Sequence, residues 1–150
     1  MINIYMDSTP ETLEQLYIAG LFEENFIEAD PRSTKSNFEL NLESCYNLLA
    51  ADMMKIIVVK DEDTPVGYVI YTIVPQDLFT KECVASTVCL YLKPKYRGGT
   101  VFKRMIEFAE TSAHMYGATV LHIGLTPTTA SLERFGYHVD NIVYSKLLEG

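Results

Sequence analysis

One stretch of the chain, residues 89–107, constrains the fold more than any other. It begins with an apolar, strand-like run that includes Leu90, Tyr91 and Leu92, and Pro94 stops this run. A basic turn with two glycines follows, and apolar residues at helical spacing begin directly after it. Strand, glycine-bearing turn and helix start form an anion site in this order, because the turn exposes backbone N–H groups and the helix N-terminus adds partial positive charge. Phosphate is the anion that such sites most often hold.

Length and charge limit what the protein is. A chain of 150 residues suits one domain, and we expect it to span residues 1–150. The formal net charge of −8 argues against nucleic-acid binding, which needs a cationic surface, and suits either a cationic acceptor or simple solubility. No apolar run approaches the ~20 residues of a membrane span, and the first residues lack a signal-peptide pattern. We therefore expect a cytoplasmic protein with no membrane or nucleic-acid partner.

The three cysteines are predicted to be reduced structural thiols. Cys83 and Cys89 fall on one predicted strand, about 20 Å apart at the usual rise per residue, which is too far for a disulfide. Cys45 lies in a separate helical segment. The histidines do not fall at ligand spacing with these cysteines, so no metal site is predicted.

The first third of the chain predicts two amphipathic helices around an acidic loop. A hydroxyl cap and a proline at 8–11 start the first helix, whose apolar face extends to Leu21. Residues 23–35 break the pattern and carry several carboxylates. A second capping pattern at 36–39 opens the next helix, which continues to Leu49.

The remainder alternates between strands and helices. A short turn at 61–65 between two apolar runs predicts an antiparallel hairpin. This order of elements predicts an α/β (α+β) protein with a mixed sheet and helices on both faces. The expected strands are 55–60, 66–74, 83–92, 118–125 and 137–147, and the expected helices run from the glycine turn to Gly117 and over 129–134.

Two stretches resemble one known family. Residues 90–98, with Pro94, Arg97 and Gly98 before a helix, resemble the acetyl-CoA-binding core of the GNAT family of N-acetyltransferases. Residues 130–137 resemble that family's closing element, a short helix that runs into a Gly-Tyr pair before the final strand. The resemblance covers nearly the whole chain. The sequence as a whole, without any one motif, is most similar to the short, divergent members carried by tailed bacteriophages.

The resemblance implies a fold and an activity. The GNAT acyl-CoA N-acyltransferase fold has a central, mostly antiparallel sheet, splayed between its fourth and fifth strands, with helices on both faces. Its members move an acetyl group from acetyl-CoA directly to a primary amine of a small molecule or a protein. An acceptor groove is expected along the first two helices near Phe22, Phe26 and Ile27, and homodimers are common in the family.

The resemblance also implies which residues meet acetyl-CoA. The strand at 90–92 should part from its neighbour at 122–124, so that its free backbone pairs with the pantetheine arm as an added strand would. The turn should hold the pyrophosphate through backbone N–H groups, with added positive charge from basic side chains. The expected cofactor-binding residues are Leu90, Tyr91, Leu92, Arg97, Gly98, Gly99, Thr100, Val101, Phe102 and Lys103.

Some family positions are changed, and this keeps an alternative function open. The small positions of the turn hold Thr100 and Phe102, although small residues allow the closest approach of backbone to phosphate. Phe102 therefore either points into the core or crowds the site. The tyrosine that protonates the departing thiolate in many members is Leu132 here, and residues 126–129 replace an upstream asparagine. A catalytically degenerate GNAT-fold binding or structural protein is the alternative, and a nucleotide-binding protein is a weaker one because no P-loop motif is present.

Amine acetylation needs a base that accepts a proton, directly or through water. His122 lies on the strand beside the splay and imidazole titrates near neutral pH, although a core histidine is the simpler reading. Glu82, at the start of the central strand, is a candidate for relaying a proton through water, and Ser86 for positioning that water. A backbone N–H near Tyr91 or Leu92 is the expected donor to the thioester carbonyl.

Overall fold

A five-stranded sheet forms the centre of the computed structural model, which describes residues 1–30, 37–74, 78–125, 132–140, 142–144, 146 and 148. The strand order is β1-β2-β3-β4-β5. The first three pairings are antiparallel and the last, between β4 and β5, is parallel. This confirms the predicted mixed, mostly antiparallel sheet. The strands are β1 (Ile2–Met6), β2 (Met54–Asp61), β3 (Thr64–Val74), β4 (Val84–Leu92) and β5 (Val120–His122).

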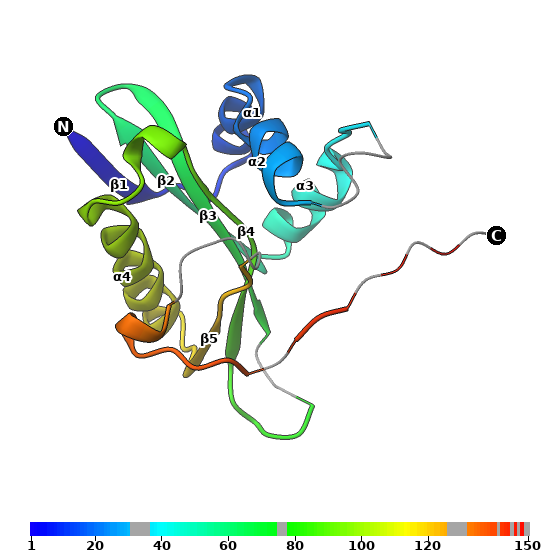
Figure 1. Ribbon diagram of the computed structural model, residues 1–150. Helices are drawn as coiled ribbons and strands as arrows, with labels where there is room; N and C mark the ends of the chain where they lie inside the picture. Colours follow the sequence, from blue (N-terminus) through cyan, green and yellow to red (C-terminus); the bar gives the residue numbers. More distant parts are fainter. Residues whose placement is uncertain are drawn as a thin grey trace.

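Helices cover both faces of the sheet, as predicted (Figure 1). One face carries three helices, α1 (Pro10–Ile18), α2 (Leu21–Ala29) and α3 (Leu42–Ala50), and the opposite face carries α4 (Thr100–Met115). There are two short 3-10 turns. Pro94–Tyr96 lies between β4 and α4, and Glu133–Phe135 follows β5 in the chain.

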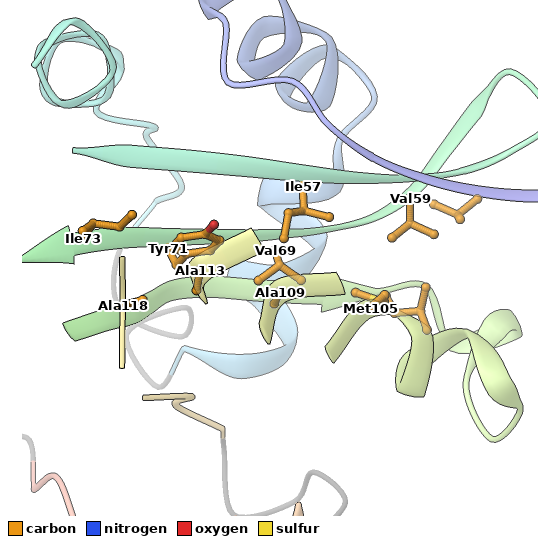
Figure 2. Packing of buried hydrophobic residues seen from close by; sticks show 12 residues of the cluster. Ile57, Val59, Val69, Tyr71, Ile73, Met105, Ala109, Ala113 and Ala118 are labelled. Carbon is orange, nitrogen blue, oxygen red and sulfur yellow. The ribbon is translucent and has the colours of Figure 1, made fainter. Parts of the chain in front are cut away.

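Two buried clusters hold these layers together. On the α4 face, Met105 and the small Ala109 lie directly against β-strand residues such as Ile57 and Val69 (Figure 2). The alanine lets the helix approach the sheet closely, so apolar area is removed from water on both surfaces. On the other face the cluster is formed by residues of α1, α2 and the sheet, among them Leu13, Leu16, Leu21, Phe22, Ile56, Val58, Tyr68 and Ile70.

The acidic segment 23–35 was predicted to be a loop, and this is wrong for its first part. Residues 23–29 belong to α2, whose Leu21 and Phe22 are almost fully buried while the acidic side chains face outward. The carboxylates mark the solvent face of an amphipathic helix. The predicted helix start at 36–39 is also wrong in its described part, because α3 begins at Leu42, where Asn41 caps it by accepting the N–H of Ser44 at 3.1 Å.

The two ends of the chain also differ from prediction. β1 was not predicted, although it pairs with β2 along its whole length. The strand predicted at 118–125 is only three residues long, and no strand is formed by the described residues of the predicted final strand, 137–140 and 142–144. The chain leaves the sheet there (Figure 1), so these residues have no neighbouring strand to bond. Of the helix predicted at 129–134, the described part is the 3-10 turn Glu133–Phe135, and residues 126–131 lie outside the described residues.

Gly67 on β3 lies opposite Leu92, near the end of β4. A Cβ at Gly67 would lie 2.7 Å from the carbonyl oxygen of Tyr91. We therefore expect Gly67→Ala to push β3 away from the end of β4 and to lower the free energy of unfolding by about 1–3 kcal/mol, measured by chemical denaturation. Gly124→Ala is the control, because a Cβ there meets nothing within 4 Å. Equal stability of the two variants would contradict this packing argument.

Candidate active site

The turn between β4 and α4 has an open backbone. Gly98 has φ +87°, a left-handed conformation that favours glycine, and Gly99 precedes the first residue of α4. No side chain caps this helix start, and its first turn has no acidic residue. A Cβ at either glycine would meet nothing within 4 Å. Since the first N–H groups of a helix lack partners within it, the turn presents free donors and room for an anion.

Two side chains fix this turn to the rest of the protein. The Arg97 guanidinium donates from Nε to the carbonyl of Leu92 at 2.7 Å and from one Nη to both carboxylate oxygens of Glu28, at 2.8 and 2.9 Å. The Tyr96 hydroxyl donates to Asp61 at 2.6 Å, and this hydrogen bond lowers the pKa of the Asp61 carboxyl. The Arg97 side chain is thus bonded within the protein, on both sides of the turn. Its backbone N–H is the part of Arg97 that is predicted to contact the cofactor.

Phe102, at a position where the family has a small residue, packs inward. Its half-buried ring joins the cluster between α4 and the sheet, and it lies 6.3 Å from the ring of Phe135, centroid to centroid. Thr100 is exposed at the helix start, and Lys103 is exposed on the next turn beside Glu107. The Phe102 ring therefore points into the core and does not crowd the turn, which is the first of the two orientations considered from the sequence.

A groove of about 440 Å³ runs along α4 from the turn. A second hollow, of about 310 Å³, lies further along the helix and reaches β5 and Tyr137. The segment 132–137 therefore forms a wall over the helix that carries the turn. The first groove is lined by Gly99, Lys103, Ile106, Glu107, Glu110, Arg134 and Phe135.

β4 and β5 separate ahead of this turn, as predicted, but the separation begins earlier on β4 than the predicted 90–92. Their last paired residues are Ser86 and His122, whereas β4 continues to Leu92. A register shift in the β3–β4 pairing leaves Val88 as an extra residue, and such a bulge bends a strand. Beyond the last pair, the Gly124 N–H donates to the side chain of Thr87 at 3.0 Å instead of to the β4 backbone. The backbone of β4 after Thr87 thus has a free edge toward β5 within the described residues.

His122 and Ser86 come together at the point of separation, and Glu82 does not join them. His122 is exposed, and its Nε2 lies 3.5 Å from a carboxylate oxygen of Asp140. Glu82 is exposed and precedes β4, so it lies outside the strand that carries Ser86. Asp140 was not predicted, because nothing in its local sequence connects it with a residue 18 positions earlier.

The sequence matches the model of the acetyltransferase (GNAT) family over residues 13–137. The chain belongs to the GNAT family. Acetyl-CoA is the acetyl donor of GNAT acetyltransferases, which confirms the predicted cosubstrate. No curated protein sequence matches this chain.

Solved structures share the GNAT fold along the whole chain at low identity. A predicted acetyltransferase from Clostridium acetobutylicum with acetyl-CoA is 12% identical with a TM-score of 0.73, over 98% of this chain and 96% of that one. The aminoglycoside acetyltransferase meta-AAC0020 from an uncultured soil metagenomic sample, in complex with sisomicin, is 14% identical with a TM-score of 0.73, over 99% and 97%. Ribosomal-protein-alanine N-acetyltransferase from Brucella melitensis biovar Abortus 2308 is 16% identical with a TM-score of 0.67, over 99% and 100%.

Helix α2 carries the residues that were predicted to line an acceptor groove. Phe22 is buried against the ring of Tyr68, so it belongs to the core, whereas Ile27 is 64% exposed. Glu24 lies 4.0 Å from Lys93, and with Glu28 it faces the start of the turn. Burial and these two glutamates raise the pKa of the neighbouring Tyr91 phenol. The acidic residues that were predicted to lie on a loop thus belong to a helix.

No thiol of this GNAT protein is in a disulfide. Burial raises the pKa of Cys89, on β4, to about 12, so the thiol is protonated at neutral pH. Leu132 is 9% exposed and offers no proton where many family members have tyrosine. Within the described ranges, no helix is long and apolar enough to cross a membrane, and no group of three or more histidine, cysteine or acidic side chains is placed to hold a metal ion.

Proposed function

We propose that this GNAT protein transfers an acetyl group from acetyl-CoA to a primary amine of a small molecule. The observation that carries the proposal is the open turn at Gly98 and Gly99 beside the free edge of β4. The turn supplies N–H donors for the pyrophosphate, and the strand edge supplies backbone partners for the pantetheine amides. Both lie on elements of the matched family region, residues 13–137.

The proposed acceptor is a small cationic amine. The exposed face of α2 is acidic, and the chain carries a net charge of −8, which attracts cations over a distance. Similar folds support this class of acceptor, because they include aminoglycoside acetyltransferases and a glucosamine-6-phosphate N-acetyltransferase from Arabidopsis thaliana. A protein acceptor is the other class represented among them.

In the proposed reaction, the amine nitrogen attacks the thioester carbonyl, the C–S bond breaks and CoA leaves as a thiolate. A backbone N–H of β4 near Tyr91 donates to the carbonyl oxygen as negative charge develops on it. His122 accepts the proton of the amine through water, because its partner Ser86 lies five residues before Tyr91 on β4, and Asp140 orients the imidazole. The thiolate takes its proton from water, since Leu132 has none to give.

Direct transfer fits this site better than an acetyl-enzyme intermediate. Cys89 lies on β4 beyond the last residue paired with β5, and burial keeps it in the weakly nucleophilic thiol form. A ternary complex of enzyme, acetyl-CoA and amine needs no protein nucleophile.

Leu132 favours the second candidate function, a GNAT-fold protein that binds CoA without catalysis. Its buried apolar side chain removes the proton donor expected from the family. Such a protein serves as a binding or structural component.

Three narrower predictions also stay predictions: a cytoplasmic location, kinship with phage-carried members, and a homodimer.

Calorimetric titration with acetyl-CoA, followed by mass spectrometry of an amine panel, tests the proposal. We expect saturable binding of acetyl-CoA and a product heavier by one acetyl group, with aminoglycosides and amino sugars as the first acceptors. Binding without any acetylated product supports the degenerate alternative. If a folded sample binds no acetyl-CoA, both functions are wrong, and binding of ATP in its place indicates a nucleotide site.

A further inference from the structure

Helix α2 and the chain that leaves β4 are joined by two ion pairs. The carboxylate of Glu28 accepts two hydrogen bonds from one Nη of Arg97, at 2.8 and 2.9 Å. The carboxylate of Glu24 lies 4.0 Å from Nζ of Lys93. The two carboxylates are one helical turn apart on α2, so a single face of this helix meets the segment between β4 and the glycine turn.

The side chain of Arg97 is held from three sides. Besides its bonds to Glu28, its Nε donates to the carbonyl of Leu92 at 2.7 Å, and its guanidinium lies 5.5 Å from the centre of the Tyr91 ring. An exposed ion pair usually contributes little to stability, but a guanidinium with several fixed partners is restrained to one orientation. Arg97 therefore links the last residue of β4 to α2.

Helix α2 is itself anchored to the sheet. Nδ2 of Asn25 donates to the hydroxyl of Tyr68, on β3, at 2.7 Å. The Phe22 ring lies 4.8 Å from the Tyr68 ring, centroid to centroid. Tyr68 is 1% exposed, so the helix is attached to a buried side chain of the core. Glu28, three residues beyond Asn25, is thus a fixed partner for Arg97.

We propose that Glu28 is a positioning residue for acetyl-CoA, and that it acts through Arg97 to hold the glycine turn in the conformation that receives the pyrophosphate. This inference rests on the proposed function. Gly98 and Gly99 follow Arg97 directly, and glycine loses more backbone freedom on ordering than any other residue. Neither has a side chain to anchor the turn, so the restraint comes from the residue before them. A turn that is ordered in advance spares the ligand this cost and raises the affinity.

The charge of Glu28 gives the proposal a definite sign. Acetyl-CoA is an anion, so removal of an acidic side chain should, by charge alone, strengthen its binding. Loss of a positioning contact should weaken the binding instead. A higher Kd in a variant that has lost a negative charge therefore separates positioning from simple electrostatics.

Glu23 provides a matched control on the same helix. It is exposed in the first turn of α2, and its side chain forms no hydrogen bond or ion pair with any residue that the structure describes. Glu23→Ala removes the same charge from the same helix and leaves the partners of Arg97 in place.

Calorimetric titration with acetyl-CoA at fixed ionic strength tests the proposal. We expect Glu28→Ala to raise the Kd by about fivefold to tenfold, because binding must then order about one more residue of backbone. Glu28→Gln keeps one acceptor oxygen for Arg97, so its Kd should lie between those of Glu28→Ala and wild type. Glu23→Ala should bind acetyl-CoA as tightly as wild type or slightly more tightly.

A double-mutant cycle shows whether Glu28 acts through Arg97. Arg97→Gln should raise the Kd at least as much as Glu28→Ala does, because it also loses a positive charge and the bond to Leu92. In the Arg97→Gln background, Glu28→Ala should cause no further loss. An equal loss in both backgrounds would mean that Glu28 acts on the ligand by another route, and would overturn the proposal.

The other outcomes are also distinct. If the wild-type protein binds no acetyl-CoA, the proposed function is wrong and this inference falls with it. If Glu28→Ala lowers the Tm but keeps the wild-type Kd, the ion pair serves stability only. If Glu28→Ala and Glu23→Ala change the Kd by the same factor, Glu28 acts by its charge only. In the last two cases the proposed function stands and the inference is overturned.

Discussion

Gly99→Trp is expected to abolish acetyl-CoA binding while the protein stays folded. Gly99 has φ −111° and ψ −153°, an extended conformation open to any residue, and its missing Cβ faces space empty to 4 Å. An indole there would cover the first N–H groups of α4, where the pyrophosphate is proposed to bind. We expect the Kd for acetyl-CoA to rise by more than about 100-fold, because several charge-assisted hydrogen bonds are lost together. Calorimetric titration measures the change.

The choice of glycine separates ligand binding from folding. Gly98→Trp would also fill the turn, but a tryptophan at φ +87° adds about 1–3 kcal/mol of backbone strain. Gly99→Ala is the control, since it keeps the turn open and should bind acetyl-CoA within a few-fold of wild type. Thermal denaturation should give Gly99→Trp nearly the wild-type Tm. An unchanged Kd in folded Gly99→Trp would show that acetyl-CoA binds elsewhere.

The middle of the fold followed from the sequence because its patterns are local. The hairpin of β2 and β3 combines two long apolar runs with a short polar turn, and few other structures satisfy both. The start of α1 was predicted to within one residue from the local pattern 8–11, in which Pro10 follows the capping residue Thr9. The β4–α4 turn was predicted for the same reason, since strand end, glycines and helix start are adjacent in the chain.

The missed elements depend on distant parts of the chain. β1 is too short to show a pattern and exists because β2 offers it an edge. The acidic residues of α2 suggested a loop because the burial of Leu21 and Phe22 is fixed by the opposite layer. β5 ends early because β4 bends away after Ser86. The sequence of β5 itself contains no signal for this bend, because the bulge lies in β4.

The same distinction applies to the site. Arg134 reaches the groove only because the segment 132–137 crosses α4, and Asp140 meets His122 only because the chain passes β5 again. For Phe102, the sequence left two orientations open, and the position of Phe135 decides between them. Local motifs therefore identify the anion turn, and tertiary contacts identify its partners.

His122→Asn is expected to lower kcat for amine acetylation by about 10²–10⁴-fold, the usual contribution of a general base. Asparagine keeps a polar side chain of similar size at the end of β5, so the pairing with β4 and the Kd for acetyl-CoA should not change. Steady-state kinetics measures kcat, and calorimetric titration measures the Kd for acetyl-CoA.

Two further variants separate catalysis at His122 from its contact with Asp140. Asp140→Asn keeps the imidazole but weakens its orientation, so we expect a smaller loss of kcat, about tenfold. Glu82→Gln should leave kcat unchanged, because this exposed carboxylate lies outside β4 and away from the paired Ser86 and His122. If His122→Asn keeps the wild-type kcat while Glu82→Gln loses it, the base is Glu82 and acts through water. If both variants keep it, the amine is deprotonated without either residue, and His122 serves only to pair β5 with Asp140.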